Sequence, residues 1–376
     1  MIEVARELAP TFSARAADGE AQRTMPADLV AAARRAGLFR LAVPRSLGGL
    51  ELDPLTVVEV VAEISRADGS AGWTVLIGNA LAFFAWLDPA VTKEMLGDEP
   101  DVVSTGVFSP QGRAAPDGEG HLVLDGRWGF NSGCVHADWF QTGFLVMDGD
   151  RPALRPDGRP DWRFAYYRRE EAEVIDTWRG TGLRGTGSHD VAVRGLRLPE
   201  AHTAMPLHDP PQHASDLLEL GFSSFTAVLL AGFPLGVARR ALDEVVALAP
   251  TKRRPYQDGT VAEDRHAQRE IGRAEAALLS ARAFADDAFG RAWDTIRAAG
   301  TSTPGQRSTI LLATQHAMEA AVDAVDVAHR LAGSTAVAED HPLARCHRDI
   351  LTARQHVAFS GERYAEYARE RLGVGV

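Results

Sequence analysis

The sequence predicts an α+β fold in three parts: an N-terminal helical domain, a central β domain and a C-terminal four-helix bundle. Residues 102–199 consist of short runs of alternating apolar and polar residues separated by turn clusters. The chain on both sides of this stretch has apolar residues at helical spacing instead. We therefore expect domains at 1–101, 102–214 and 215–376.

The first domain contains the clearest helical periodicity, in the segment TVVEVVAEISRADG. VPRSLGG, just before it, is predicted to be a loop because of its proline and two glycines. The longest uncharged run lies between Asp68 and Asp88 and is nearly long enough to span a bilayer. Polar residues within it and acidic residues at its flanks favour a buried core helix.

The central domain is expected to be a barrel or a sandwich, from strand candidates such as HLVLDGRW, WFQTGFLVM and HDVAVRGLRLP. After a loop rich in proline and histidine, four segments are predicted to be the helices of an antiparallel bundle. These segments are 216–250, 261–299, 305–332 and 342–372.

Charge and cysteine content restrict the function. The 376 residues have a formal net charge of −11, which disfavours nucleic acid or an anionic membrane as partner and leaves a small molecule as the expected ligand. Cys134 and Cys346 are the only cysteines, too few for a disulfide framework or a four-cysteine zinc site. We expect no metal and a reducing, cytoplasmic environment. The N-terminus does not have the pattern of a signal peptide.

Three stretches resemble one protein family. They are GLFRLAVPRSLGGLELDPLTVVEVVAEISRADGSAGW, then GRWGFNSGCVHADWF with DTWRGTGLRGTGSHDVAVRGLRLP, and finally HPLARCHRDILTARQHVAF. Together they resemble the acyl-CoA dehydrogenase fold superfamily, and in particular the oxygenase components of two-component flavin-dependent monooxygenases, the group D or phenol hydroxylase-like branch. The resemblance covers nearly the whole chain and implies the same three-part architecture.

Dehydrogenases of this superfamily commonly place a catalytic glutamate in a Tyr-Glu-Gly-Thr segment. The comparable stretch here reads AFSGERY, with Ser360 at the glutamate position and Glu362 close by. The monooxygenase branch resembles this chain at His356, and the resemblance implies that His356 is a general base for the substrate. The alternative is an ordinary histidine of an amphipathic helix.

In GRWGFNSG, we expect Trp128, Phe130 and Ser132 on one face of a strand and Asn131 on the other. The resemblance implies that this strand lies along the flavin ring. Ser132 would then lie near N5 and hydrogen-bond the flavin or its peroxide, with Trp128 and Asn131 beside it. The alternative is that Trp128 and Phe130 belong to the core of the β domain and that Ser132 only starts a turn at Gly133.

Three further residues are implied to contact the cofactor. Thr105 would touch the pyrimidine edge of the flavin, although a turn before Gly106 is the alternative. Arg253, three residues before Tyr256, would bind the phosphate of a flavin in a neighbouring subunit, unless it is one more solvated arginine in an arginine-rich chain. Gly333 would pack near the cofactor, unless it serves only as a helix C-cap.

Two other motifs match the patterns of a dinucleotide site and a metal site, but neither is expected to bind such a ligand. GTGLRG, at 180–185, fits the dinucleotide-binding pattern and has Glu200 at a suitable later distance, but a strand-like segment follows it where a helix is required. His202, His208 and His213 are spaced six and five apart in a loop, which does not place them on one face for a metal.

The resemblance implies an oxygenase component that uses reduced FMN or FAD, with FMN slightly favoured, supplied by a separate flavin reductase. Dioxygen would react through a C4a-hydroperoxide to hydroxylate or N-oxidise a small organic substrate. A homotetramer is implied, because the family usually completes its cofactor site across subunits. Two alternatives stay open: an FAD-dependent acyl-CoA dehydrogenase and a noncatalytic flavin-fold binding protein.

Overall fold

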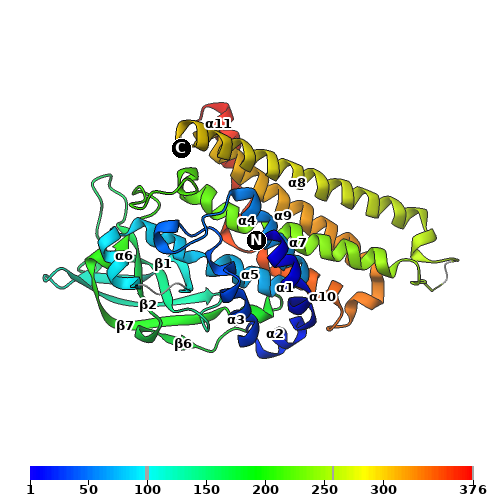
Figure 1. Cartoon of the computed structure of the whole chain (residues 1–376), viewed down its shortest axis with the longest axis horizontal. Coiled ribbons are helices and arrows are strands. Elements are labelled where there is room, and N and C mark those ends of the chain that lie inside the picture. The colour runs from blue at the N-terminus through cyan, green and yellow to red at the C-terminus, as the bar shows by residue number, and fades with distance from the viewer. Residues whose placement is uncertain (98–100, 256–257, 375–376) are drawn as a thin grey trace.

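The structure, a computed structural model, describes residues 1–97, 101–255 and 258–374. Helices come first, a sheet follows, and long helices complete the chain, so the predicted α+β architecture is confirmed (Figure 1). The first helices are α1 (Ile2–Ala14), α2 (Ala16–Gln22), α3 (Ala27–Arg35), α4 (Pro54–Ala67), α5 (Gly69–Gly78) and α6 (Pro89–Leu96).

The long uncharged run forms α5 and the 3-10 helix η3 (Ala80–Trp86), and both pack into the main core as the sequence predicts. Asp68 begins α5 as its N-cap, because its carboxylate accepts the backbone N–H of Ala71 at 3.0 Å. Asn79 ends the helix, and its side chain donates to the carbonyl oxygens of Leu38 and Val75.

Eight strands form one sheet in the order β6-β7-β2-β1-β3-β5-β8, with β4 paired to β3. β1 and β3 are parallel, and the other ladders are antiparallel. The sheet ends at β6 and β8, so the expected barrel is instead a single open sheet in the part of the chain that the structure describes. The strands are β1 (Ser104–Pro116), β2 (His121–Asn131), β3 (Trp139–Asp148), β4 (Arg151–Pro152), β5 (Trp162–Arg168), β6 (Glu173–Ile175), β7 (His189–Pro199) and β8 (Thr203–Ala204).

The predicted alternation along β2 fails at Phe130. Its φ of 62° lies in the left-handed region, and the pairing of β2 with β7 shifts register between Trp128 and Asn131. Phe130 is therefore 77% exposed, whereas Trp128 and Asn131 are both buried. The expectation that Trp128, Phe130 and Ser132 share one face was wrong, and so was the alternative of Phe130 in the core.

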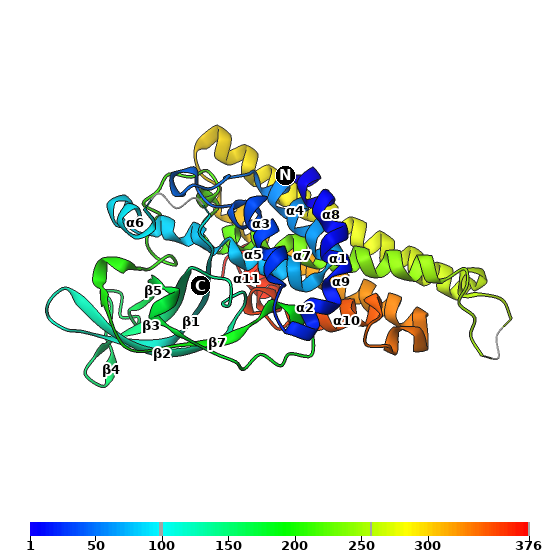
Figure 2. The same cartoon turned by 60° about the horizontal axis from the view of Figure 1, so that its bottom comes forward.

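The C-terminal helices are α7 (Phe222–Leu248), α8 (Arg265–Ala299), α9 (Pro304–Ala332), α10 (Pro342–Ala353) and α11 (Glu362–Leu372). The first three run side by side away from the sheet (Figures 1 and 2). The predicted fourth helix is really two, because the chain turns between Ala353 and Glu362. His356 lies in that turn and not on a helix.

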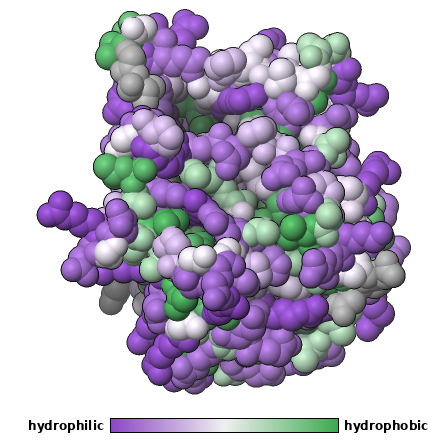
Figure 3. Space-filling view, turned by 90° about the vertical axis from the view of Figure 1, so that its left-hand side faces the viewer, coloured by the Kyte–Doolittle hydropathy of each residue, from purple (hydrophilic) through white to green (hydrophobic). Residues whose placement is uncertain are grey.

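α7 is the one described helix that is long and apolar enough to cross a membrane, and 78% of its most apolar window is buried inside the protein. Burial of this kind is typical of a core helix. Most of the apolar residues join one core that runs from the N-terminal helices into the bundle, and a second core lies within the sheet domain. At the sheet end of the molecule, hydrophobic side chains appear as separate patches among hydrophilic ones (Figure 3).

Candidate active site

Trp73 on α5 brings together the two residues to which the sequence assigns catalytic roles. Its indole N–H donates to the hydroxyl oxygen of Ser132 at 3.1 Å. Its ring meets the imidazole of His356 edge to face, with ring centroids 5.6 Å apart. Phe233 of α7 packs against the indole as well, at 5.1 Å. The sheet, α5 and the turn after α10 therefore converge at this tryptophan.

Ser132 belongs to a chain of hydroxyl groups. Its oxygen lies 2.7 Å from that of Ser188, which lies 2.6 Å from the hydroxyl of Thr186. Thr186 in turn donates to the carbonyl oxygen of Leu183 at 2.8 Å. Because a carbonyl oxygen can only accept, these hydrogen bonds can all be present together in one direction only. In that direction Ser132 donates to Ser188, and Ser188 donates to Thr186.

This direction determines what Ser132 can offer a ligand. Its own hydrogen is committed to Ser188, and one acceptor position is taken by the indole N–H of Trp73. One acceptor position remains on the hydroxyl oxygen. Ser132 can therefore accept a hydrogen bond from a bound group while the chain stays intact, but it cannot donate one.

His356 is a neutral imidazole. Burial lowers its pKa from 6.5 to about 4. Nδ1 accepts the backbone N–H of Ala358 at 3.3 Å, so the proton of the neutral ring is on Nε2. In this arrangement Nε2 is a donor. Accepting a proton would require the ring to release Ala358 or change tautomer.

Thr105 and Asn131 lie next to this cluster with their polar atoms unpaired. Thr105 is inside β1 and not at a turn, and its methyl group would lie 3.3 Å from a Cβ placed on Gly133. The hydroxyl of Thr105 and both side-chain polar atoms of Asn131 are buried without a hydrogen-bond partner. Because such groups cost on the order of 1 to 3 kcal/mol each, a polar ligand that pairs with them is favoured. The polar heteroatoms of a flavin fit this requirement.

Trp128, by contrast, has no unpaired polar atom to offer a cofactor. It is fully buried in the core of the sheet domain, and its indole N–H donates to the carbonyl oxygen of Gly143 at 2.7 Å. Its hydrogen-bonding capacity is already satisfied. We correct the cofactor interpretation of Trp128 accordingly and assign it to the core, which was the alternative.

Arg253 and Gly333 lie together, but far from Ser132. Arg253 is exposed in the loop between α7 and α8, at the end of the bundle away from the sheet (Figure 2). Its neighbour Lys252 donates to Thr335 at 2.7 Å, close to Gly333. From Phe233 beside Trp73 to the end of α7 is about 22 Å of helix. Within one subunit, these two residues cannot share a ligand group with Ser132.

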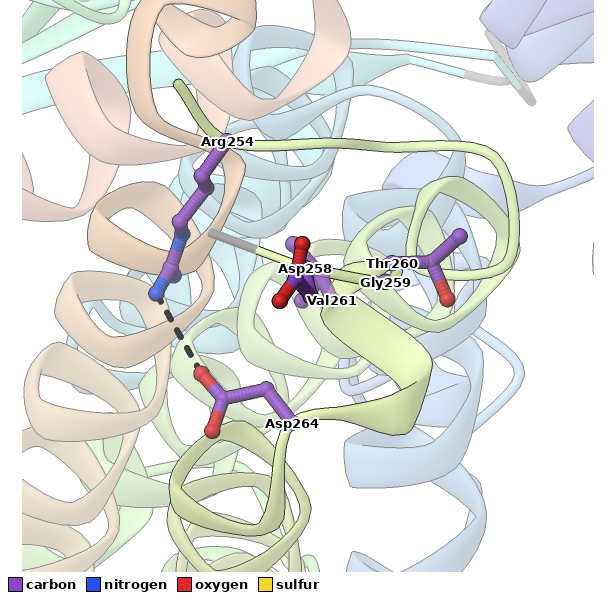
Figure 4. Close-up of a pocket in the computed structure, with 6 residues that line it drawn as sticks. All are labelled: Arg254, Asp258, Gly259, Thr260, Val261 and Asp264. Atoms are coloured by element: carbon purple, nitrogen blue, oxygen red, sulfur yellow. Dashed lines mark hydrogen bonds and ion pairs between the residues drawn. The ribbon is translucent and has the colours of Figure 1, made fainter. Parts of the chain in front are cut away.

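A cavity of about 260 Å³ is lined by Arg254, the residue after Arg253, and by Asp258, Gly259, Thr260, Val261 and Asp264. Figure 4 shows Arg254 reaching across it toward Asp264, and the two side chains form an ion pair at 3.5 Å. Gly333 itself has a φ of 59°, and its backbone N–H donates to the carbonyl oxygen of His329, so it caps the end of α9. Tyr256, part of the motif that pointed to Arg253, lies outside the described residues.

The two other motifs have structural roles. No helix of the dinucleotide-binding type follows GTGLRG, and a Cβ on Gly182 would come within 2.0 Å of the carbonyl oxygen of Arg348, so the glycines let this loop pack on α10. His213 is buried and bonded through both ring nitrogens, to Ser46 at 2.9 Å and Thr92 at 3.1 Å. Among the described residues no group of three metal-ligating side chains occurs.

A dehydrogenase-type carboxylate is missing from the comparable stretch. Glu362 is exposed at the start of α11 and pairs with Arg369 of the same helix at 3.7 Å. Ser360 occupies the position where the glutamate would fall. Sequence reasoning did not identify Trp73, Thr186 or Ser188 as site residues, although Trp73 closes the first family-like stretch and the other two directly precede a predicted strand.

Comparisons with known proteins identify the superfamily. The family model described as "Acyl-CoA dehydrogenase, N-terminal domain" matches residues 2–95, and "Acyl-CoA dehydrogenase, C-terminal domain" matches residues 228–361. The 3-HSA hydroxylase from Rhodococcus sp. RHA1 superposes with a TM-score of 0.90 at 25% identity, over 100% of this chain and 97% of that one. Fold and site thus define a flavoprotein of the acyl-CoA dehydrogenase superfamily.

Curated relatives identify the branch. The indole-3-acetate monooxygenase of Pseudomonas putida is 35% identical over 93% of this chain and 87% of its own length. The oxygenase subunit HsaA of Rhodococcus jostii is 29% identical, over 98% of this chain and 97% of its own length. XiaF from Streptomyces sp., solved with FADH2 and glycerol, is 26% identical with a TM-score of 0.88, over 100% of this chain and 95% of that one. The chain belongs to the flavin-dependent monooxygenases of this superfamily.

The chain is therefore an oxidoreductase, the oxygenase component of a two-component system that uses reduced FMN or FAD. Its relatives imply a separate flavin reductase as partner and a small organic molecule as substrate. The dehydrogenase and the noncatalytic alternatives are not supported.

Proposed function

We propose that this oxygenase inserts oxygen into an aromatic substrate of the indole-acetate class, with Ser132 facing the flavin and His356 facing the substrate. One observation carries the proposal: Trp73 contacts both residues, through its N–H at 3.1 Å and through its ring at 5.6 Å. Two relatives named indole-3-acetate monooxygenase, at 35% and 31% identity, support the substrate class.

Ser132, Thr105 and Asn131 would hold the flavin. Reduced flavin, when bound, supplies the electrons that activate dioxygen for insertion into the substrate. Ser132 keeps one free acceptor position, which suits the N–H that reduced flavin carries at N5 and oxidised flavin lacks. This protein would therefore favour reduced flavin through the direction of its hydroxyl chain.

His356 would orient the substrate by donating from Nε2. The sequence favoured a base at this position, but Nδ1 is engaged with Ala358 and the pKa of the ring is about 4. A neutral donor holds a carboxylate, carbonyl or phenol oxygen without changing charge near neutral pH. Trp73 and Phe233 exclude water on the protein side of the ring.

Arg253 is proposed to bind a flavin phosphate across a subunit interface, in a homotetramer. Its support is the position of the Arg253 loop, which is too far from Ser132 to act on the same flavin within one chain. The exposed guanidinium of Arg253 is accessible to a phosphate bound by a neighbouring subunit.

The test is oxygenation with labelled dioxygen. The purified protein, a flavin reductase, NADH and FMN or FAD are incubated with indole-3-acetate or p-hydroxyphenylacetate under ¹⁸O₂, and products are analysed by mass spectrometry. We expect an ¹⁸O atom in the indole product. If indole-3-acetate yields only hydrogen peroxide while p-hydroxyphenylacetate yields a labelled product, the proposed substrate class is overturned but the enzyme class is not.

A further inference from the structure

Asp349 is a buried carboxyl group that none of the proposed roles uses. It lies on α10, seven residues before His356, with 1% of its surface exposed. One of its oxygens accepts the backbone N–H of Leu183 at 2.6 Å, and the other has no hydrogen-bond partner. Leu183 and Asp349 are 166 residues apart in the sequence.

The Leu183 peptide is also where the hydroxyl chain from Ser132 ends. Its carbonyl oxygen accepts from the Thr186 hydroxyl at 2.8 Å, and its N–H is held by Asp349. Leu183 has a φ of 51°, a left-handed conformation that is unfavourable for a residue with a side chain. Contacts from outside the loop must therefore stabilise this conformation. The hydrogen bond from the Leu183 N–H to Asp349 is such a contact.

The same carboxyl group lies against the start of α5. A Cβ on Gly69 would come within 2.6 Å of the unpaired oxygen of Asp349, and the neighbouring Asp68 caps the helix that carries Trp73. Asp68 also has an unpaired buried oxygen. Asp349 thus contacts both segments that orient Ser132, the loop before β7 and the start of α5.

The charges around this group favour its neutral form. Burial and the carboxylate of Asp68 raise the pKa of Asp349 to about 8, against 3.8 ordinarily. Glu20 is occupied by Arg345 at 3.1 Å and Arg348 at 2.8 Å. The charged or titratable groups from all packed elements are Glu20, Arg66, Asp68, Arg240, Arg345, Cys346 and Arg348.

We propose that Asp349 is a positioning residue for the flavin site: by holding the N–H of Leu183, it fixes the position of the carbonyl oxygen that ends the hydroxyl chain and so keeps the acceptor position of Ser132 free. The proposal rests on the proposed role of Ser132. It concerns a residue that lies outside the cluster around Trp73 and acts on Ser132 through Leu183, Thr186 and Ser188 without touching Ser132 itself.

The test measures hydrogen peroxide release from the holoenzyme with reduced FMN and dioxygen, without an organic substrate. Asp349→Leu fills the volume but removes the acceptor, whereas Asp349→Asn keeps it. We expect Asp349→Leu to release peroxide roughly 5- to 10-fold faster than wild type, the factor for one lost hydrogen bond. Ser188→Ala should do the same, and Asp349→Asn should stay near wild type. Asp161→Asn, a buried carboxylate bonded to Arg163, is the control.

The outcomes separate the two proposals. If Ser132→Ala releases peroxide at the wild-type rate, the proposed function of Ser132 fails. If Ser132→Ala releases peroxide faster than wild type but a folded Asp349→Leu does not, the positioning role of Asp349 fails, whatever the rate of Ser188→Ala. If Asp349→Leu does not fold, Thr186→Val is measured in its place, because it breaks the same row of hydroxyl hydrogen bonds. Amide exchange in residues 179–188 provides a flavin-free readout: it should accelerate in Asp349→Leu and not in Asp349→Asn, and equal protection in both would overturn the proposal.

Discussion

Trp73 donates its indole N–H to Ser132 at 3.1 Å, a bond that joins residues 59 positions apart and connects the helical domain to the sheet. It also occupies one of the two acceptor positions on the serine. The indole therefore affects both where Ser132 sits and what Ser132 can bind. This relationship has consequences that can be measured.

Trp73→Phe should keep the ring contacts to Phe233 and His356 but lose the bond to Ser132. We expect less product and more peroxide per dioxygen consumed, with a cost of about 1 kcal/mol for one hydrogen bond. An oxygen electrode combined with product and peroxide assays measures this. Trp128→Phe is the matched control: it should lower the free energy of unfolding by about 1 to 3 kcal/mol without changing affinity for reduced flavin. Weaker flavin binding in Trp128→Phe would show that Trp128 belongs to the cofactor site after all.

His356→Gln separates a donor from a base. Glutamine can donate from its amide but cannot take up a proton, so the donor role predicts that His356→Gln keeps much of the oxygenation rate. His356→Leu should lose roughly 10- to 100-fold if the bonded substrate group is charged. Equal loss in both variants would instead indicate the base expected from the sequence.

The pH profile of the wild type provides a second check on His356. Because the pKa of His356 is about 4 in the folded protein, its ring stays neutral near neutral pH. Product formation should show no acid limb near the ordinary imidazole value of 6.5. An acid limb there that disappears in His356→Gln would show that the buried, neutral ring is not the active form.

Asp349 should make the protein less stable as pH rises. The folded state keeps a proton on this carboxyl up to about pH 8, whereas the unfolded chain releases it above 3.8. The unfolded state thus binds fewer protons across this window, and linkage lowers the free energy of unfolding as pH increases. Asp349→Asn does not have this loss. The difference in free energy of unfolding between variant and wild type, measured in urea, should therefore shift in favour of the variant as the pH rises from about 5 to about 8. Parallel pH curves for variant and wild type would contradict the raised pKa.

Arg253→Ala should weaken flavin binding and leave the subunit folded. If the cofactor site is shared between subunits, mixed oligomers of Arg253→Ala and Ser132→Ala should contain some sites with neither change. Activity should then recover on mixing two poorly active variants, and sedimentation should show an oligomer. No recovery from oligomers proven to be mixed would place Arg253 outside the flavin site.

The three-part fold could be predicted because the change from helical to alternating periodicity is local to each segment. The prediction failed where one residue changed the local geometry. Phe130 adopts a positive φ, so the alternation of side chains between the two faces of the strand does not continue past it as predicted. The break after Ala353 was missed because no proline or glycine follows that residue until Gly361.

The site was only partly predictable. Ser132 and His356 were predicted from short motifs that resemble the family and stay predictions, whereas Trp73, Ser188 and Asp349 become candidates only through contacts between distant segments. Neither spacing nor composition encodes such pairs. The tautomer of His356 likewise depends on its bond to Ala358 in a turn that the sequence did not indicate.

The central claim is that Ser132 offers an acceptor to reduced flavin, and anaerobic titration tests it most directly. Oxidised and reduced flavin, FMN and FAD each, are titrated into wild type and Ser132→Ala, with binding followed by fluorescence or calorimetry. We predict tighter binding of the reduced form to wild type, and loss of most of this preference in Ser132→Ala. Tighter binding of the oxidised form to wild type, or a preference for the reduced form that Ser132→Ala retains in full, would contradict the account.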